Sequence, residues 1–129
     1  MKRFSSRPLP DFKSLYRALF NHKNSDSELV FFDLGRDALL FGVEVLGIKP
    51  GGTILIPAYM CNSTIEPLSK AGYKIIFFDV KDDLNFDLNM IESLITSLDI
   101  DAILSVHYFG FPTNILDLVR LCKKYNVKV

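Results

Sequence analysis

Short apolar runs alternate with longer amphipathic stretches along most of the chain. The runs contain many β-branched residues and predict buried strands over 29–32, 53–56, 74–80 and 102–106. Between them, apolar residues recur at helical spacing and predict helices over 38–46, 63–71, 90–98 and 115–122. Because neighbouring parallel strands need crossover connections, this order predicts an α/β fold with a parallel or mostly parallel sheet and covering helices.

The two ends of the chain differ from this alternation. Residues 11–22 carry an apolar stripe behind Asp11, a favourable N-cap residue, and predict an amphipathic helix followed by a polar linker. We therefore divide the chain into an N-terminal helix and linker, residues 1–28, and an α/β region, residues 29–129. The last residues, 127–129, would begin another strand with no helix to cover it, which indicates part of a longer domain.

Composition narrows the possible functions. Hydrophobic residues make up 49% of the chain and charged residues 23%, which is typical of a folded globular domain. The 15 Lys and Arg residues balance the 15 Asp and Glu residues, so no net positive field favours nucleic acid or anionic lipid. The apolar runs are far shorter than the roughly 18 to 20 residues that span a bilayer. We expect a cytoplasmic protein that binds neither nucleic acid nor a membrane.

Cysteine and histidine usage supports the same expectation. Cys61 and Cys122 are too few for a disulfide framework, which favours a reducing compartment. With His22 and His107 they form no zinc-ligand spacing, and turn chemistry explains the carboxylates between 79 and 87. We predict no metal site.

The turn at Gly35 is a candidate phosphate site. Ligands of parallel sheets collect at the carboxyl ends of the strands, and Gly35 leads from a predicted strand into a predicted helix. A glycine there lets an anion approach the backbone N–H groups of Arg36, Asp37 and Ala38. The alternative is that Gly35 only makes the turn. The residues match neither a Walker nor a dinucleotide-binding motif.

A second candidate region follows the strand predicted over 53–56. The Tyr59 ring and the Cys61 sulfur could cover a planar ligand, and Asn62 could meet its polar atoms. The alternatives are a packed loop and a helix cap, in which Ser63 and Glu66 have the spacing of a capping box. Cys61 could also be a nucleophile, since a thiol at a helix N-terminus has a lowered pKa.

A third candidate region follows the strand predicted over 102–106. His107 and Tyr108 open a loop that contains Gly110 and Pro112. The imidazole could donate or accept a hydrogen bond in a site, or act as the base for Cys61. Equally, it could anchor its own loop by binding backbone groups.

These residues belong to a set of short motifs that resembles the DegT/StrS aminotransferases. The motifs occur in order at residues 35–39, 46–51, 56–59, 66–72, 78–80, 85–87 and 106–112. The resemblance covers roughly residues 29 to 129 and implies the large domain of a fold-type-I pyridoxal-phosphate enzyme. Many members aminate a nucleotide-linked keto-sugar with glutamate or glutamine as amino donor and act as homodimers.

The resemblance also assigns residues to the cofactor. Gly35, Arg36 and Asp37 occupy the place of the family's turn that binds the cofactor phosphate. Cys61 stands where many members have an aromatic residue stacked on the pyridine ring, so we assign the ring to Cys61 and Tyr59. It further implies substrate-binding or supporting roles for Asn62, His107 and Tyr108.

Two residues that the family requires fall outside this sequence. The aspartate that pairs with the pyridine nitrogen lies just beyond the strand that starts at Val127, and the Schiff-base lysine lies further on. We therefore assign no catalytic residue in this chain and expect it to be an N-terminal fragment, inactive alone. Three other readings remain open: a non-catalytic α/β module that binds a phosphorylated ligand, half of a split enzyme, and a small flavodoxin-like domain. An amine-transferring member and a dehydratase that uses the same cofactor are not distinguished by these residues.

Overall fold

The computed structural model describes residues 32–129. The helix expected over 11–22 lies outside this range, as does most of the strand expected over 29–32. Phe32, the described residue of that strand, lies in no regular element.

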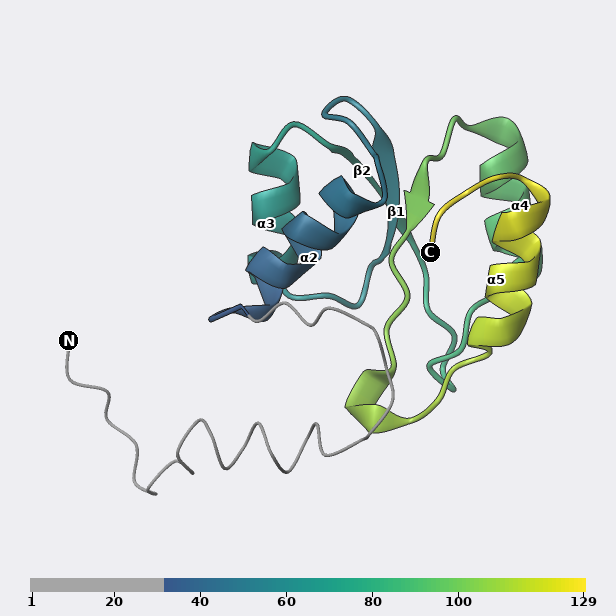
Figure 1. Cartoon of the computed structure of the whole chain (residues 1–129). Helices are drawn as coiled ribbons and strands as arrows, with labels where there is room; N and C mark the ends of the chain where they lie inside the picture. The colour runs from purple at the N-terminus through teal and green to yellow at the C-terminus, as the bar shows by residue number, and fades with distance from the viewer. Residues whose placement is uncertain (1–31) are drawn as a thin grey trace, which may run out of the picture. The chain divides into compact units, whose positions relative to one another are not determined.

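A parallel sheet of three strands forms the centre of the described region (Figure 1). Its strands lie in the order β2 (Lys74–Phe78), β1 (Thr53–Pro57), β3 (Ala102–Ile103). β1 pairs with both neighbours in parallel register, and Lys128 adds a parallel bridge to Ala102 on the outer side of β3. The predicted α/β fold with a parallel sheet is confirmed.

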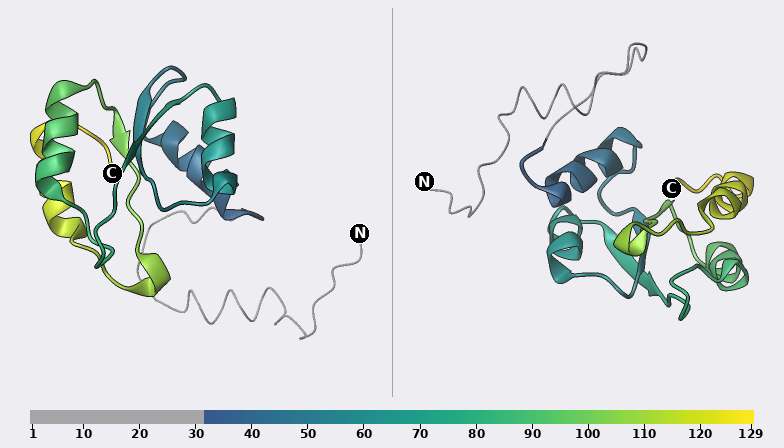
Figure 2. Two further views of the ribbon diagram at one scale, coloured as in Figure 1. Left: turned by 180° about the vertical axis from the view of Figure 1, so that it is seen from behind. Right: turned by 90° about the horizontal axis from the view of Figure 1, so that it is seen from below.

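Helices cover both faces of the sheet (Figure 2). On one face lie α2 (Gly35–Val45) and α3 (Asn62–Lys70), and on the other α4 (Leu88–Ser97) and α5 (Ile115–Lys124). Side chains of the central strand alternate between two cores, since Ile54 and Ile56 pack under α2 and α3 while Leu55 packs under α4 and α5. All five residues of β1 are buried. This explains why its sequence is a continuous apolar run.

Two strands are shorter than the sequence predicts. The expected strand over 102–106 pairs with β1 only at Ala102 and Ile103, and one further bond joins Leu104 N to Leu55 O at 2.9 Å. The chain then leaves the sheet for a short 3₁₀ helix, η1 (Tyr108–Gly110), which the pattern did not predict. The expected strand over 74–80 ends at Phe78 because Val80 bridges to Phe86 in antiparallel fashion.

The start of α3 also differs from expectation. The helix begins at Asn62 with Cys61 as N-cap, and no side chain caps it, so the capping box predicted from Ser63 and Glu66 is wrong. Ser63 already lies in the first turn, and Glu66 pairs instead with Lys70 one turn on, at 2.6 Å.

Side chains near the starts of α4 and α5 have well-defined partners. The Asp87 carboxylate accepts hydrogen bonds from Asn89 N and Met90 N and caps α4. Asn114 is the N-cap of α5, as predicted, but its side chain makes no cap bond. It bonds both backbone groups of Phe86 instead, at 3.2 and 3.3 Å. These bonds tie the start of α5 to the loop before α4.

Candidate functional site

The candidate residues gather at the end of the sheet where the strands finish. We call this region the carboxyl edge and define it as the start of α2, residues 58–64 after β1 and residues 104–114 after β3. α2 leads through a turn into β1 and runs opposite to it, so its N-terminus lies at this end (Figure 1). The carboxyl edge is where open parallel sheets bind ligands.

The start of α2 presents free backbone donors. Leu34 is the N-cap, and its carbonyl accepts from Asp37 N at 3.1 Å and Ala38 N at 3.3 Å. The N–H groups of Gly35 and Arg36 have no acceptor among residues 32–129. A Cβ built on Gly35 would meet nothing within 4 Å. The start of α2 therefore carries two backbone donors without acceptors among the described residues, at the positive end of an 11-residue helix.

Arg36 faces the first turns of α3. Arg36, Ser63, Glu66, Pro67 and Lys70 line a surface hollow of about 270 Å³. The hydrogen bond and charge of Lys70, together with the charge of Arg36, lower the pKa of Glu66. Arg36, in the first turn of α2, thus adds positive charge near Glu66 of α3.

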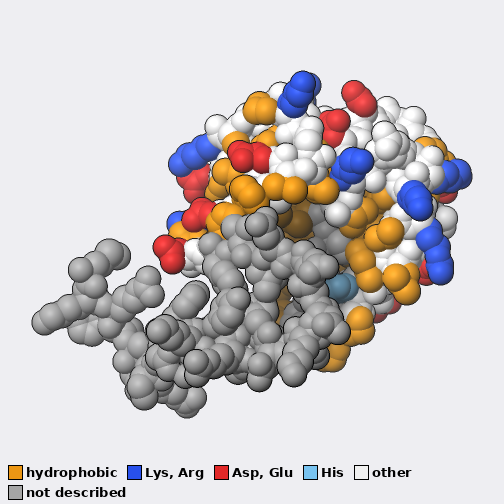
Figure 3. Space-filling view, viewed as in Figure 1, with side chains coloured by type: hydrophobic (Ala, Val, Ile, Leu, Met, Phe, Trp, Pro, Cys, Tyr) orange, Lys and Arg blue, Asp and Glu red, His pale blue; other side chains and the backbone are white. Residues whose placement is uncertain are grey.

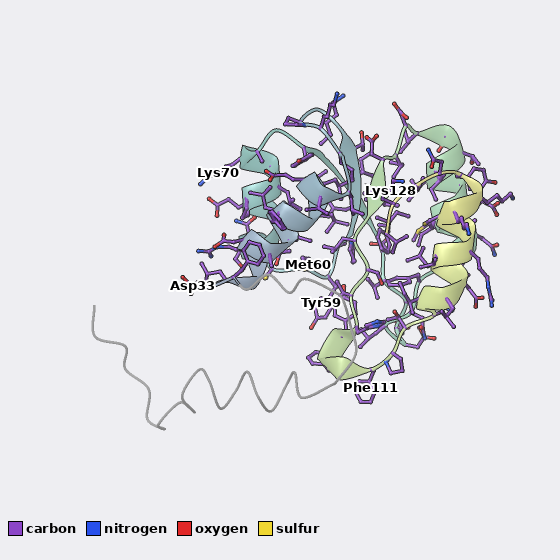
Figure 4. All side chains as sticks on the ribbon, in the orientation of Figure 1. Asp33, Tyr59, Met60, Lys70, Phe111 and Lys128 are labelled. Carbon is purple, nitrogen blue, oxygen red and sulfur yellow. The ribbon has the colours of Figure 1, made fainter. Side chains whose placement is uncertain are left out.

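The loop after β1 is held from two sides. Ala58 N donates to Phe78 O of β2 at 2.8 Å, and the Tyr108 hydroxyl donates to Tyr59 O at 2.8 Å. The rings of Tyr59 and Tyr108 lie 5.3 Å apart in a tilted arrangement. Tyr59 is 59% exposed, whereas Tyr108 is only 8% exposed, and burial raises the pKa of Tyr108. Figure 4 shows Tyr59 and Met60 between α2 and the loop that carries Phe111.

Cys61 is exposed and bonded to two hydroxyl groups. Its Sγ lies 3.1 Å from Ser63 Oγ and 3.2 Å from Thr64 Oγ1. These hydrogen bonds lower the pKa of the Cys61 thiol, the Ser63 bond most. Within residues 32–129 no imidazole is bonded to this sulfur, so the structure does not assemble the Cys61–His107 pair that a nucleophilic thiol would need.

His107 binds its own loop. Its Nδ1 accepts from Thr113 N at 3.2 Å and lies 3.1 Å from Thr113 Oγ1. Since the backbone N–H is a donor, Nδ1 is the acceptor and the neutral ring carries its proton on Nε2. Nδ1 therefore anchors the loop, as in the alternative stated above, and the Nε2–H group can donate a hydrogen bond elsewhere. Asn62, the first residue of α3, is exposed.

Sequence reasoning missed some features of this edge. Ser105 Oγ is buried with no hydrogen-bond partner in the described part of the chain. A polar residue inside the apolar run 102–106 was the available signal. Phe109 has a φ of 54°, in the left-handed region that L-residues rarely adopt. Nothing in the sequence marked that conformation.

Two kinds of feature are absent from residues 32–129. No helix there combines the length and apolar character that crossing a bilayer requires. No three side chains among the His, Cys, Asp and Glu residues of that range come close enough together to hold a metal ion.

Comparisons with known proteins identify close similarities. The model of the DegT/DnrJ/EryC1/StrS aminotransferase family matches residues 18–129. A UDP-N-acetyl-3-dehydro-alpha-D-glucosamine 3-aminotransferase of Acidithiobacillus ferrooxidans is 31% identical over 97 residues, 74% of this chain and 26% of the relative. A GDP-4-keto-6-deoxy-D-mannose 3-dehydratase of Escherichia coli is 25% identical over 122 residues, 94% of this chain and 30% of the relative.

The fold is similar to solved structures of the same group. An aminotransferase of this family from Brucella abortus superposes with a TM-score of 0.65 at 25% identity, over 72% of this chain and 27% of its own. The chain thus spans about a quarter of the length of the relatives that it matches. Since the family model covers most of the sequence and the parallel α/β fold agrees, the chain belongs to the DegT/DnrJ/EryC1/StrS aminotransferase family.

Proposed function

We propose that this chain is the N-terminal part of a pyridoxal-phosphate-dependent aminotransferase that acts on a nucleotide-linked keto-sugar, with glutamate or glutamine as amino donor. The names of the relatives support the substrate class, since several are aminotransferases of UDP- and dTDP-linked sugars. In this proposal the complete enzyme is a cytoplasmic homodimer that serves amino-sugar and polysaccharide biosynthesis. The observation that carries the proposal is the open, donor-lined start of α2 within a chain of this family.

The start of α2 has the chemistry that a phosphate group requires. Gly35 leaves the approach open, and two backbone N–H groups point away from the helix without acceptors among the described residues. Arg36 adds a charge that can pair with phosphate oxygens. Together with the helix dipole, these groups fit the phosphate of the cofactor. Asp37 belongs to the same first turn. Its negative charge interacts favourably with the positive end of the helix dipole and does not itself attract the anion.

The residues after β1 and β3 fit the planar part of the cofactor. Tyr59 offers an exposed aromatic ring and Cys61 an exposed, polarizable sulfur, at the position where the family resemblance implies an aromatic side chain in many members. Asn62 and the Nε2–H of His107 are polar groups on the same edge, and in this proposal they meet the substrate. When bound, pyridoxal phosphate supplies the electron sink for moving an amino group. The roles of this chain's residues are to hold and orient it.

The resemblance places the Schiff-base lysine beyond this sequence, and the positions of four described lysines agree with that. Lys70 pairs with Glu66, and Lys124 pairs with Glu92 at 2.9 Å. Lys74 and Lys128 lie at the opposite edge of the sheet, where the strands begin. We therefore expect no transamination by the isolated chain. Incubation of the purified chain with cofactor, a keto-sugar nucleotide and glutamate tests this directly, and any turnover above a no-protein control would contradict it.

Binding of pyridoxal phosphate tests the cofactor site itself. We expect absorbance or fluorescence titration to show binding that inorganic phosphate competes away, because both ligands use the start of α2. Arg36→Glu should weaken this binding, because it places a negative charge beside the anion site. Lys123→Glu makes the same charge change at an exposed position of α5, and it should leave the binding unchanged. Equal loss in both variants, or binding that phosphate does not displace, would argue against the site.

A related activity is the second candidate. The dehydratase of Escherichia coli matches nearly the whole chain, at 25% identity over 94% of it. Such an enzyme uses the same part of the fold, and the residue that decides between amine transfer and dehydration lies outside residues 1–129. Completing the chain with the downstream coding sequence and assaying both reactions separates the two.

A further inference from the structure

Tyr108 joins the two loops of the carboxyl edge. Its hydroxyl donates to the backbone carbonyl of Tyr59, 49 positions earlier in the sequence, at 2.8 Å. Its ring also packs against the Tyr59 ring, with centroids 5.3 Å apart. A buried tyrosine hydroxyl normally finds one partner, and here that partner is the backbone of the loop after β1.

The loop that carries Tyr108 is braced internally. Gly110 N bonds His107 O at 3.2 Å, Phe111 N bonds Tyr108 O at 3.0 Å, and Thr113 N bonds the His107 ring at 3.2 Å. Phe109 is held in the left-handed region within this turn. Several bonds therefore fix the position from which the Tyr108 hydroxyl reaches out.

The loop after β1 depends more on contacts from outside. Ala58 N is bonded to β2 and Met60 N to Ala58 O, both within 2.9 Å. Past them, the Cys61 side chain bonds the hydroxyls of Ser63 and Thr64, and its carbonyl accepts from Thr64 N at 3.1 Å, so all these bonds stay within the start of α3. Of these contacts, the bond from Tyr108 is the one that links residues 59–61 to β3 and its loop.

We propose that Tyr108 is a positioning residue, whose hydrogen bond to the Tyr59 carbonyl holds residues 59–61 in the conformation that covers the ring of a bound cofactor. This inference rests on the proposed function for the identity of that ligand. Tyr108 acts through Tyr59 and Cys61 and not by touching the reacting atoms. Removal of the Tyr108 hydroxyl should weaken the binding of ligands that contain a ring. The binding of inorganic phosphate, which needs only the start of α2, should not change.

The test compares two variants that lose the same kind of bond. Tyr108→Phe removes the bond to Tyr59 O and keeps the ring. Tyr73→Phe removes the hydroxyl of another buried tyrosine, which donates to Ile48 O at 3.1 Å at the opposite end of the sheet. Tyr73 is 5% exposed and Tyr108 8%, so the two changes are closely matched.

The first readout needs no ligand. Hydrogen exchange followed by mass spectrometry on the full chain should show faster exchange of the Ala58 and Met60 amides, the two hydrogen-bonded amides of the loop after β1, in Tyr108→Phe. Exchange in that segment should stay unchanged in Tyr73→Phe. Equal exchange in Tyr108→Phe and the wild type would overturn the inference, since the bond would then hold nothing.

The second readout separates positioning from general stability. Tyr108→Phe should bind pyridoxal phosphate roughly 2- to 12-fold more weakly, the range for loss of one neutral hydrogen bond, and bind inorganic phosphate normally. Parallel loss for both ligands, or no loss for either, would overturn the ligand-related part of the inference. A wild-type chain that binds no pyridoxal phosphate would refute the proposed cofactor site, and the exchange experiment alone would then decide the role of Tyr108.

Discussion

The two cysteines show how position alone sets the chemistry of one residue type. Cys61 is exposed at the start of α3, and hydrogen bonds from Ser63 and Thr64 lower the pKa of its thiol. Cys122 is a residue of α5 whose side chain is buried in the core, and burial raises its pKa to about 11. Since the thiolate is the reactive form, iodoacetamide at neutral pH should label Cys61 and spare Cys122. Mass spectrometry of tryptic peptides from the folded protein measures both.

A double variant checks the cause of the lowered pKa. Ser63→Ala with Thr64→Val removes both hydroxyls, so the Cys61 thiolate should form only at higher pH. The pH at which the labelling rate reaches half its maximum should move upward relative to the wild type. An unchanged profile would mean that the hydroxyls do not stabilise the thiolate. The labelling of Cys122 after denaturation is the internal control for reagent activity.

At the same scale, the sequence predicted where in the fold the candidate residues lie better than it predicted their contacts. Gly35, Tyr59 and His107 were selected because they follow strands of a parallel sheet, and all lie at the carboxyl edge. The bond between Tyr108 and Tyr59 joins residues 49 positions apart. Such pairing depends on the distance between two loops in space, which periodicity does not encode. The Ser105 hydroxyl has no hydrogen-bond partner among residues 32–129, and its burial could not be inferred from the sequence pattern.

Among the elements, those with long apolar stripes were predicted well. α2, α4 and α5 lie close to their expected ranges, because burial of one face determines where a helix forms. The sequence predictions that were wrong concern the residues at which elements begin or end. β3 stops after two residues because the chain turns toward η1, and α3 starts one residue earlier than its expected cap. Tertiary hydrogen bonds at the ends of elements, such as those of Asn114 at the start of α5 to Phe86, join distant loops, and the periodicity of the sequence does not encode them.

Two glycines in different elements should respond oppositely to the same substitution. Gly42 lies within α2, and an added Cβ would meet nothing within 4 Å. Gly42→Ala should therefore stabilise the fold by about 0.5–1 kcal/mol, since alanine loses less conformational freedom in a helix. At Gly52, just before β1, a Cβ would come within 2.8 Å of the Ile48 side chain and 3.0 Å of Lys49 O.

Because the Lys49 carbonyl belongs to the backbone and yields little, Gly52→Ala should cost about 1–3 kcal/mol. Urea unfolding of the wild type and the two variants measures both changes in the free energy of unfolding. A loss of stability in Gly42→Ala would show that its apparent space is filled in solution.

At the scale of the whole fold, residues 32–129 cover one face of the sheet less completely than the other. An apolar hollow of about 380 Å³ lies between α2 and β3, and Val45, Ile54, Leu104 and Val129 are among its lining residues. Figure 3 shows hydrophobic side chains in a band across this side of the described region. Phe41 and Val45 extend the apolar surface along α2. Contiguous surface of this kind binds apolar groups.

This hollow predicts where a hydrophobic dye binds. We expect 1-anilinonaphthalene-8-sulfonate to fluoresce with the native chain, because its rings can enter the hollow. Val45→Gln should reduce the enhancement, since Val45 lines the hollow and is 69% exposed. Leu116→Gln on α5 makes a similar change at a residue that is 71% exposed and does not line it, and should leave the fluorescence unchanged. Equal reductions in both variants would mean that the dye reports general apolar exposure and not this hollow. Circular dichroism must show the same helix content in all three proteins, because loosened packing would also bind the dye.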